Sequence, residues 1–442
     1  MLIGTAAALA VCYAIATEAI LLGSPRGRWH YRYVQPLTIK PFLVALAVTL
    51  PAALLLRIRL PATRTGEWLL VLGWIALATA VQGALRSLTL FSFERIFASP
   101  GANSFYTATL QQPLAAVLAE FSQLRGALPL HAQSNMPGKL VLLYGLEVFT
   151  TNPLALAWLV VLLSNLGALL MYRFVRRLFD DRTTALYAAI LYLFVPSKLF
   201  FFPLMNTVTP VVALAFACLV LEWLRTARTR WAATAGAMLY LVVLFEPLPL
   251  VLGLLFAALA GRGLQRGDLE WRRLLAQSAV ALLAFAACAV GVYVVWGFDL
   301  AAGFMSVRQH AMEFNAIERR PYDIWVRANL VEFVVGMGIC QAVLIAGALA
   351  LSAAAPESWR DRLSHPIVVT TVALVATVAA IDLIGVNRGE TIRLWIFLAC
   401  FLQIPAAWVA ARTGRSALAL VLLTTLVLSA LGTANIGFVV PE

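Results

Sequence analysis

Runs of apolar residues recur along the whole 442-residue chain, separated by short polar segments. As a helix, a run of about twenty residues crosses a hydrocarbon core of about 30 Å. Backbone groups in lipid must be hydrogen-bonded within their own segment, and no run alternates in polarity like a barrel strand. The pattern predicts an all-α, polytopic integral membrane protein with about 13 transmembrane helices. The predicted spans are residues 2–22, 39–56, 67–86, 154–172, 184–201, 205–224, 231–246, 248–260, 274–296, 328–351, 367–385, 394–411 and 416–435.

Two of these runs have an alternative to a transmembrane span. Residues 2–22 lack a basic leading segment and a small-residue cleavage site, so we expect a retained helix and not a signal peptide. Residues 248–260 follow Glu246-Pro247 and are short, so this run is either a span or a re-entrant piece. We expect residues 1–442 to form a single transmembrane domain.

Basic residues predict the orientation. Hydrophobic residues make up 62% of the chain and charged residues 12%, yet the net charge is +12. The excess of basic residues lies in alternate short loops, as the positive-inside rule requires, so we expect these loops on the cytoplasmic side. Because membrane orientation accounts for the positive charge, we expect no nucleic-acid partner. They contain Arg57, Arg59, Arg64, Arg173, Arg176, Arg177, Arg182, Arg225, Arg228, Arg230, Arg262, Arg266, Arg272, Arg273, Arg360, Arg362, Arg412 and Arg415. A basic group at residues 26–40 is the exception, because the alternation of the spans places it on the extracytoplasmic side.

The other side receives the longer loops, in which acids, bases, amides and aromatic residues mix. Residues 87–150 are the first large extracytoplasmic loop, residues 297–327 are the second, and residues 386–393 form a short turn. Within the first loop, residues 114–124 and 139–150 have apolar residues at helical spacing but are too short to cross a membrane. They are either interfacial helices or packing struts. Function is expected on this side.

Common enzyme signatures are absent from the sequence. It contains no GxxxxGK[ST], GxGxxG, HExxH or GxSxG motif, which removes the sequence support for ATP-driven transport and dinucleotide chemistry. The five cysteines all lie in apolar runs, and there are only four histidines. We therefore expect no cofactor and no metal site.

The first loop carries two candidate clusters. Glu94 follows the third span, where it is a candidate proton acceptor or a structural partner of a neighbouring arginine; Asn103 and Tyr106 lie shortly after it. Further on, His131 and Lys139 flank a Pro-Gly break. This second segment is a candidate phosphate site or an ordinary turn with a snorkelling lysine.

Two more clusters are rich in arginine. The second loop holds Arg308, His310, Glu313, Glu318, Arg319 and Arg320, and adjacent arginines suit an anionic group. A solvated run of charges is the alternative.

The 386–393 turn contains Arg388, Glu390 and Arg393, which form an anion site or an ion pair that stabilises the turn. Lys198 and Glu246 lie near the outer ends of apolar spans, where ionisable groups are costly and suggest a function.

Taken in order, these features resemble the GT-C superfamily of polyprenyl-phosphate-sugar-dependent glycosyltransferases. The resemblance rests on a long outer loop with an acidic residue and a Ser-Phe-Tyr segment, followed by Met136-Pro137-Gly138 and a span with Ser164-Asn165. The resemblance also includes a basic turn, a span ending in Val195-Pro196 and the later Arg-Gly-Glu…Arg-Leu-Trp turn. It is strongest over residues 67–250 and 386–400.

The resemblance implies an inverting glycosyltransferase (EC 2.4 class) that moves a sugar from a polyprenyl-phosphate donor to a lipid or glycan acceptor on the outer face of a bacterial plasma membrane, without a metal. Glu94 would be the catalytic base. Arg319, Arg320, Arg388 and Arg393 would bind the donor phosphate, with Lys139, His131 and Lys198 at the donor entrance. The alternatives are a flippase for a lipid-linked precursor, and an oligosaccharide polymerase or ligase.

Overall fold

The computed structural model describes residues 1–354 and 365–441, so Arg360 and Arg362 of one basic loop lie outside the described residues. Among these residues nearly all regular secondary structure is helical, apart from a two-residue antiparallel pairing between β1 (Gly23–Ser24) and β2 (Trp29–His30) and an isolated bridge between Tyr33 and Ile436. The prediction of an all-α, polytopic membrane protein is confirmed.

The predicted spans all coincide with helices. These are α1 (Leu2–Ala16), α2 (Lys40–Arg57), α3 (Arg64–Arg86), α10 (Pro153–Phe179), α11 (Arg182–Leu193) with α12 (Pro196–Phe201), η2 (Met205–Thr207) with α13 (Thr209–Thr226), α14 (Thr229–Phe245), η3 (Leu248–Leu252) with α15 (Gly253–Gln265), α16 (Trp271–Trp296), α18 (Tyr322–Met337) with α19 (Ile339–Ala354), α21 (Pro366–Ile384), α22 (Thr391–Leu394) with α23 (Ile396–Phe401) and α24 (Gln403–Thr413), and α25 (Arg415–Asn435).

The count of full-length spans is lower than thirteen. Among the described residues, ten helices are long and apolar enough to cross a membrane, or eleven if the bent pair α18–α19 is one span. The other two, α1 and α14, have 15 and 17 residues. The run after Glu246-Pro247 continues to Gln265 and reaches spanning length, because η3 and α15 follow one another without a break.

Residues 328–351 do not form the continuous span that their hydropathy predicted. α18 and α19 meet at an angle of 100°. Gly338 lies between them with φ +109°, a backbone conformation that side chains with a Cβ rarely adopt. The carbonyl of Met337 beside the bend accepts a hydrogen bond from Gln403 Nε2 at 3.2 Å, so a backbone group there is still satisfied inside the protein.

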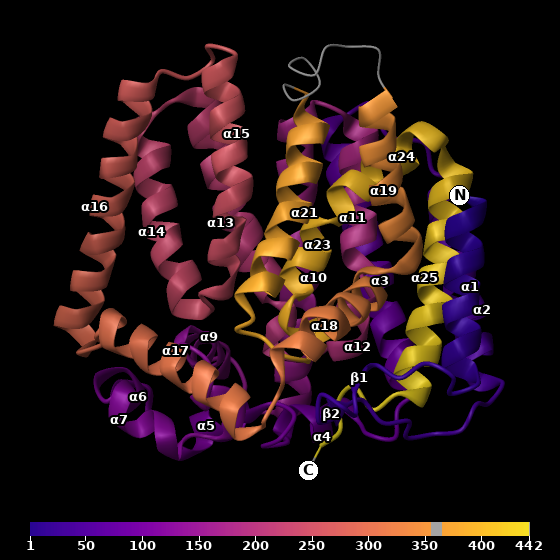
Figure 1. Cartoon of the computed structure of the whole chain (residues 1–442), viewed down its shortest axis with the longest axis horizontal. Helices are drawn as coiled ribbons and strands as arrows, with labels where there is room; N and C mark the ends of the chain where they lie inside the picture. Colours follow the sequence, from indigo (N-terminus) through magenta and orange to yellow (C-terminus); the bar gives the residue numbers. More distant parts are fainter. Residues whose placement is uncertain (355–364, 442) are drawn as a thin grey trace.

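The two ends of the bundle differ in character (Figure 1). The described loops with the predicted cytoplasmic arginines, which exclude the one with Arg360 and Arg362, lie at one end, which is the top in this view. At the other end lie the β1–β2 hairpin, the C-terminus and the short helices α4 (Phe93–Ala98), α5 (Ser104–Gln111), α6 (Leu114–Ala119), α7 (Phe121–Leu124), η1 (Arg125–Ala127), α8 (Leu130–Gln133), α9 (Gly138–Glu147) and α17 (Leu300–Ile317). The basic segment at residues 26–40 is at this second end, as the alternation of the predicted spans indicated.

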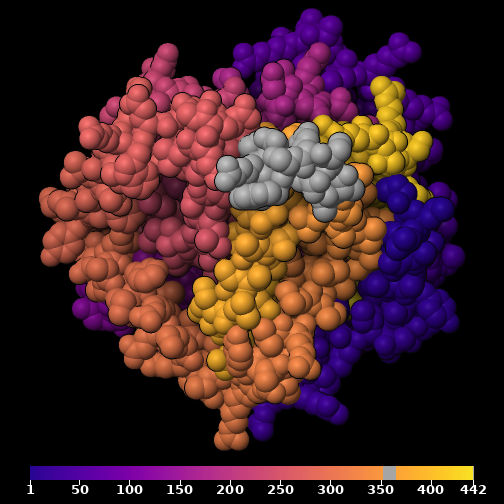
Figure 2. Space-filling model, turned by 45° about the horizontal axis from the view of Figure 1, so that its top comes forward, coloured from indigo at the N-terminus to yellow at the C-terminus, as the bar shows by residue number. Residues whose placement is uncertain are grey.

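Burial within the bundle is uneven. The segment Arg182–Phe201 is buried along its length, whereas no part of the apolar window of α16 is buried. α16 is therefore the most lipid-facing of these helices, and it leads directly into α17, which lies across the end of the bundle (Figure 1). Figure 2 shows the surface hollowed between the coral segment near residues 270–300 and the gold segment of α21.

Candidate functional site

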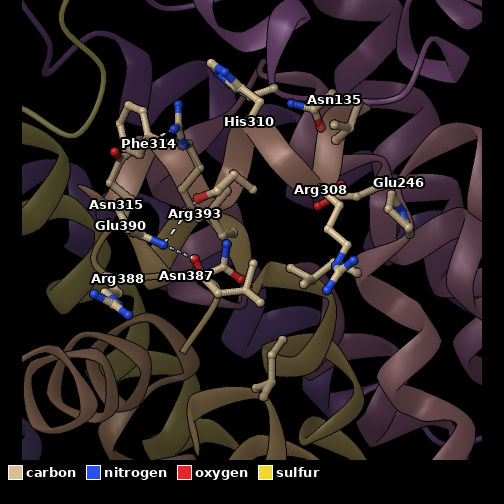
Figure 3. A pocket seen from close by; sticks show the side chains of 18 of the residues that line it. Asn135, Glu246, Arg308, His310, Phe314, Asn315, Asn387, Arg388, Glu390 and Arg393 are labelled. Atoms are coloured by element: carbon tan, nitrogen blue, oxygen red, sulfur yellow. Dashed lines mark hydrogen bonds and ion pairs between the residues drawn. The ribbon is translucent and has the colours of Figure 1, made fainter. Parts of the chain in front are cut away.

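A cavity of about 380 Å³ opens at the end of the bundle that carries the short helices. Its walls come from α8 and the turn after it, the start of η3, α17, the end of α21 and the 386–394 turn (Figure 3). Its polar lining consists of His131, Ser134, Asn135, Asn206, Glu246, Arg308, His310, Asn315, Arg320, Asn387, Arg388, Glu390 and Arg393. Five separate parts of the sequence, residues 130–135, 206, 246–251, 304–320 and 381–394, thus contribute to one pocket.

The 386–393 turn is shaped by two polar side chains of α18. Asn329 donates from Nδ2 to the Asn387 carbonyl at 2.9 Å and accepts from the Gly389 amide at 3.0 Å. Glu332 accepts from the Thr391 amide at 2.8 Å. Because both side chains are buried, the backbone of the turn is held in one geometry and its charged side chains are directed from a rigid base.

Arg320 and Arg388 are locked together by exchanged hydrogen bonds. Arg320 Nη1 donates to the Arg388 carbonyl at 2.6 Å, and Arg388 Nη1 donates to the Arg320 carbonyl at 2.8 Å. Glu390 joins the group by accepting from Arg320 Nη2 at 3.4 Å and from Arg393 Nη2. The second loop and the turn, which the sequence analysis treated separately, therefore form one cluster.

Aromatic rings hold Arg320 in place. Its guanidinium carbon lies 5.4 Å from the ring centre of Trp29, 5.0 Å from that of Phe314 and 5.9 Å from that of Trp325. Its side chain is only 5% exposed. Such contacts are favourable for a guanidinium, which is weakly hydrated and can stack on rings.

This cluster has more positive charge and more donors than its own residues use. Three guanidinium groups and one carboxylate leave a net charge of +2 for Arg320, Arg388, Arg393 and Glu390. Nε of Arg320 and Nε of Arg393 are buried without a hydrogen-bond partner among the described residues. Burial raises the pKa of Glu390, but Arg393 and Arg320 more than offset this and hold it below its usual value. An anion is the ligand that would satisfy the spare donors.

His131 connects the first large loop to this cluster. Arg393 Nη1 lies 3.0 Å from His131 Nε2, and an arginine can only donate, so this nitrogen accepts and the ring is neutral. Desolvation of the ring and the charge of Arg393 lower the pKa of His131 to about 3. Near neutral pH the histidine therefore orients Arg393 without adding a charge.

The lowered pKa of His131 predicts a pH effect on stability. Below about pH 6.5 the unfolded chain takes up a proton on this histidine, but the folded protein does not until about pH 3. This component of stability is complete above pH 6.5, and we expect it to decline by about 1.4 kcal/mol per pH unit as the pH falls toward 3. Thermal unfolding of wild type and His131→Gln in detergent from about pH 8 to about pH 5 measures it. Equal pH slopes for the two proteins would contradict a neutral His131.

Lys139 and Glu246 form a second charged group. Lys139 is fully buried, and its Nζ lies 2.8 Å from Glu246 Oε2 and 2.8 Å from Asn135 Oδ1. Thr209 Oγ1 donates to the same glutamate oxygen at 2.5 Å. In Figure 3 Glu246 and Arg308 lie on one side of the cavity and Arg388 and Glu390 on the other. The ammonium of Lys139 is thus already committed to protein partners.

Several expected residues lie outside the cavity. Glu94 is exposed on α4. Asn103 is buried and donates to the Phe97 carbonyl at 3.0 Å, and Tyr106 donates to the Thr151 carbonyl at 3.1 Å, so both brace the first loop. None of the three lines the cavity.

The remaining expected residues are also placed elsewhere. Glu313, Glu318 and Arg319 are exposed on or next to α17 and do not line the cavity, whereas His310 of the same helix does. Lys198 is buried inside the bundle, where it donates to Asn165 Oδ1 at 2.9 Å.

The sequence analysis placed Arg308 in the second-loop cluster without a role of its own, and it missed the two residues that shape the turn. Within the described residues, Arg308 lines the cavity and forms no ion pair. Asn329 and Glu332 fell at the start of a run taken as a span, although polar groups inside apolar runs are a functional signal. No group of three or more His, Cys, Asp or Glu side chains that could hold a metal ion is present in the part of the chain that the structure describes.

Comparisons with known proteins show a distant structural likeness. No family model and no curated protein sequence matches the chain. The crystal structure of the apo oligosaccharyltransferase of Archaeoglobus fulgidus aligns with 82% of this chain at a TM-score of 0.44 and 14% identity. The oligosaccharyltransferase AglB of the same archaeon, in complex with an inhibitory peptide and a dolichol-phosphate, aligns with 82% at 0.43 and 13%. This chain spans 56% of the length of each.

Proposed function

We propose that this protein is a membrane glycosyltransferase that transfers a sugar from a polyprenyl-phosphate donor to a lipid or glycan acceptor on the extracytoplasmic face. The observation that carries the proposal is the cluster of Arg320, Arg388 and Arg393, with unused buried donors, in the wall of a cavity at the edge of a membrane bundle. The order of sequence motifs that resembles the GT-C superfamily supports the same function.

The size and lining of the cavity suit a sugar phosphate. A volume of about 380 Å³ falls within the range of small-molecule sites, which is about 300–1,000 Å³. Guanidinium groups match phosphate oxygens in charge and geometry. Amide side chains of Asn135, Asn206 and Asn387 also line the space and provide the donors and acceptors that sugar hydroxyls need.

The surroundings of the cavity suit a lipid-linked donor. Leu248, Val251, Ile381 and Ile384 line it alongside the charged groups. A second hollow of about 520 Å³ lies between α14, α16 and the start of α17, and Phe304 lines both spaces. This hollow is lined mainly by apolar side chains beside the lipid-facing α16, where a prenyl chain would avoid water.

The arginines would act on the leaving group. As the acceptor oxygen attacks the anomeric carbon, the bond from that carbon to the phosphate oxygen breaks and negative charge develops on the phosphate. Fixed guanidinium groups stabilise that charge more than the spread charge of the ground state. In-line attack from the opposite side inverts the anomeric centre. The cavity lies at the end of the bundle opposite the basic loops, which supports a reaction on the extracytoplasmic side.

The proposal is tested with purified protein in lipid nanodiscs, radiolabelled polyprenyl-phosphate sugars and a lipid extract from the host. We expect label in a new lipid or glycan, and its chemistry names the sugar. Donor that binds and crosses the bilayer unchanged would identify a flippase instead. Transfer from an oligosaccharide-diphosphate lipid, but from no monophosphate donor, would identify a polymerase or ligase.

A further inference from the structure

The two sides of the cavity carry different charged groups, and Arg308 lies with Glu246 on one of them. Arg320, Arg388 and Arg393 make one side anion-binding. On the other side, Glu246 presents a carboxylate whose side chain is 8% exposed, backed by the fully buried Lys139.

The two oxygens of Glu246 are used unequally. Lys139 Nζ at 2.8 Å and Thr209 Oγ1 at 2.5 Å both bind Oε2. Oε1 has no hydrogen-bond partner among residues 1–354 and 365–441, and the side chain lines the cavity. Lys139 is itself fixed by Asn135, so the carboxylate is held in one orientation with an unoccupied acceptor oxygen.

We propose that Glu246 binds the acceptor hydroxyl through Oε1 and takes its proton during transfer. This inference rests on the proposed glycosyltransferase function and assigns the catalytic base within it. It also gives the acceptor a chemical class, which is a compound that reacts through a hydroxyl group.

The step balances in atoms and electrons. The acceptor O–H bond breaks, its proton passes to Glu246 Oε1, and the oxygen electron pair forms the bond to the anomeric carbon. The bond from the anomeric carbon to the phosphate oxygen breaks, and its electron pair stays on the polyprenyl phosphate. That phosphate faces the arginine side of the cavity. The proton on Glu246 then leaves with the phosphate or through water.

The placement of Glu94 supports this choice. Glu94 is exposed on α4 and does not line the cavity, so a hydroxyl held against the arginine side would have no contact with it. Glu390, which is the other carboxylate in the lining, already has Arg320 and Arg393 on its two oxygens. Glu246 is therefore the cavity carboxylate with an oxygen left for a substrate.

The test is Glu246→Gln in the full-length protein in nanodiscs. Glutamine has the same shape, and its carbonyl can still accept from Lys139 and Thr209, so we expect the variant to fold. We expect transfer to fall by about 100-fold or more, which is typical for loss of a general base. Binding of a short-chain prenyl phosphate should be unchanged, because the arginine side is intact.

The matched control is Glu222→Gln. Glu222 has the same 8% side-chain exposure and also pairs with a cation, Arg177 Nε at 2.9 Å, but it lies on α13 at the other end of the bundle. We expect full transfer activity from this variant.

Four outcomes would overturn the inference. Transfer by Glu246→Gln within about threefold of wild type would remove the proton-accepting role. Loss of prenyl phosphate binding in this variant would assign Glu246 to the donor. Activity in Glu246→Gln together with its loss in Glu94→Gln would return the base role to Glu94. Absence of transfer by the wild-type protein with every donor would overturn the proposed function itself, and this inference with it.

Discussion

Arg393→Ala is expected to lower the rate of sugar transfer by about 100- to 1,000-fold, which is the usual cost of removing one fixed donor to a developing charge. Arg393 lines the cavity, contacts both His131 and Glu390, and has a buried Nε without a partner among the described residues. Glu390 keeps its contact with Arg320 in this variant, so we expect a folded protein. The measurements are the rate of label transfer and the binding of a short-chain prenyl phosphate.

Two further variants, a control and a conservative substitution, help to interpret this result. Arg177→Ala removes an arginine that also pairs with a buried glutamate, Glu222, but at the opposite end of the bundle, and should leave transfer intact. Arg393→Lys keeps the positive charge, but its single ammonium cannot replace the two guanidinium nitrogens that contact His131 and Glu390. We therefore expect this variant to recover only part of the transfer rate. Full activity in Arg393→Ala would show that the cluster does not bind the leaving phosphate.

Trp325→Ala is expected to destabilise the protein by about 3–5 kcal/mol, the usual cost of truncating a buried tryptophan. Trp325 is fully buried between Gly27 of the hairpin segment and Gly389 of the turn, and its ring also contacts Arg320. Its indole Nε1 donates to the Gly27 carbonyl at 3.1 Å. Because this one side chain supports the base of the arginine cluster, transfer should be lost with stability. Thermal unfolding in detergent measures the first effect.

The control for this variant is Trp271→Ala. Trp271 is 59% exposed at the start of α16, so its removal should change the unfolding temperature little. Trp325→Phe keeps most of the ring but loses the hydrogen bond to Gly27, which should cost about 1 kcal/mol. An unfolding temperature for Trp325→Ala equal to that of wild type would mean that the turn keeps its geometry without the tryptophan.

Much of the candidate site could be found from residue types alone. Arg320, Arg388, Glu390, Arg393, His131 and Glu246 all line the cavity and were all candidates from the sequence, because charged residues between apolar spans are few and noticeable. Asn329 and Glu332 were missed because they lie on a helix whose hydropathy resembled that of a span. Their importance comes from the bend at Gly338, which turns α18 across the end of the bundle toward the turn.

The sequence indicated which residues belong to the candidate site more readily than it indicated the role of each residue. Lys139 was grouped with His131 as a candidate phosphate site, but in the folded chain its ammonium is bound to Glu246 and Asn135. Arg319 and Arg320 are neighbours of identical type, yet Arg320 is buried among aromatic rings and Arg319 is exposed with φ +48°. Local sequence does not distinguish such neighbours, because burial depends on which distant segments pack against them.

The sequence by itself determined the membrane class, the helical content, the approximate position of every span and the end of the bundle at which charged residues gather. These properties follow from the free energy of transferring apolar side chains and unpaired backbone groups into lipid, which each segment carries locally. Only the tertiary structure decided which charges meet. The pairing of residue 320 with 388, of 131 with 393 and of 139 with 246 joins segments 68, 262 and 107 positions apart. Such pairings depend on how helices pack and bend, and hydropathy along the chain does not encode that geometry.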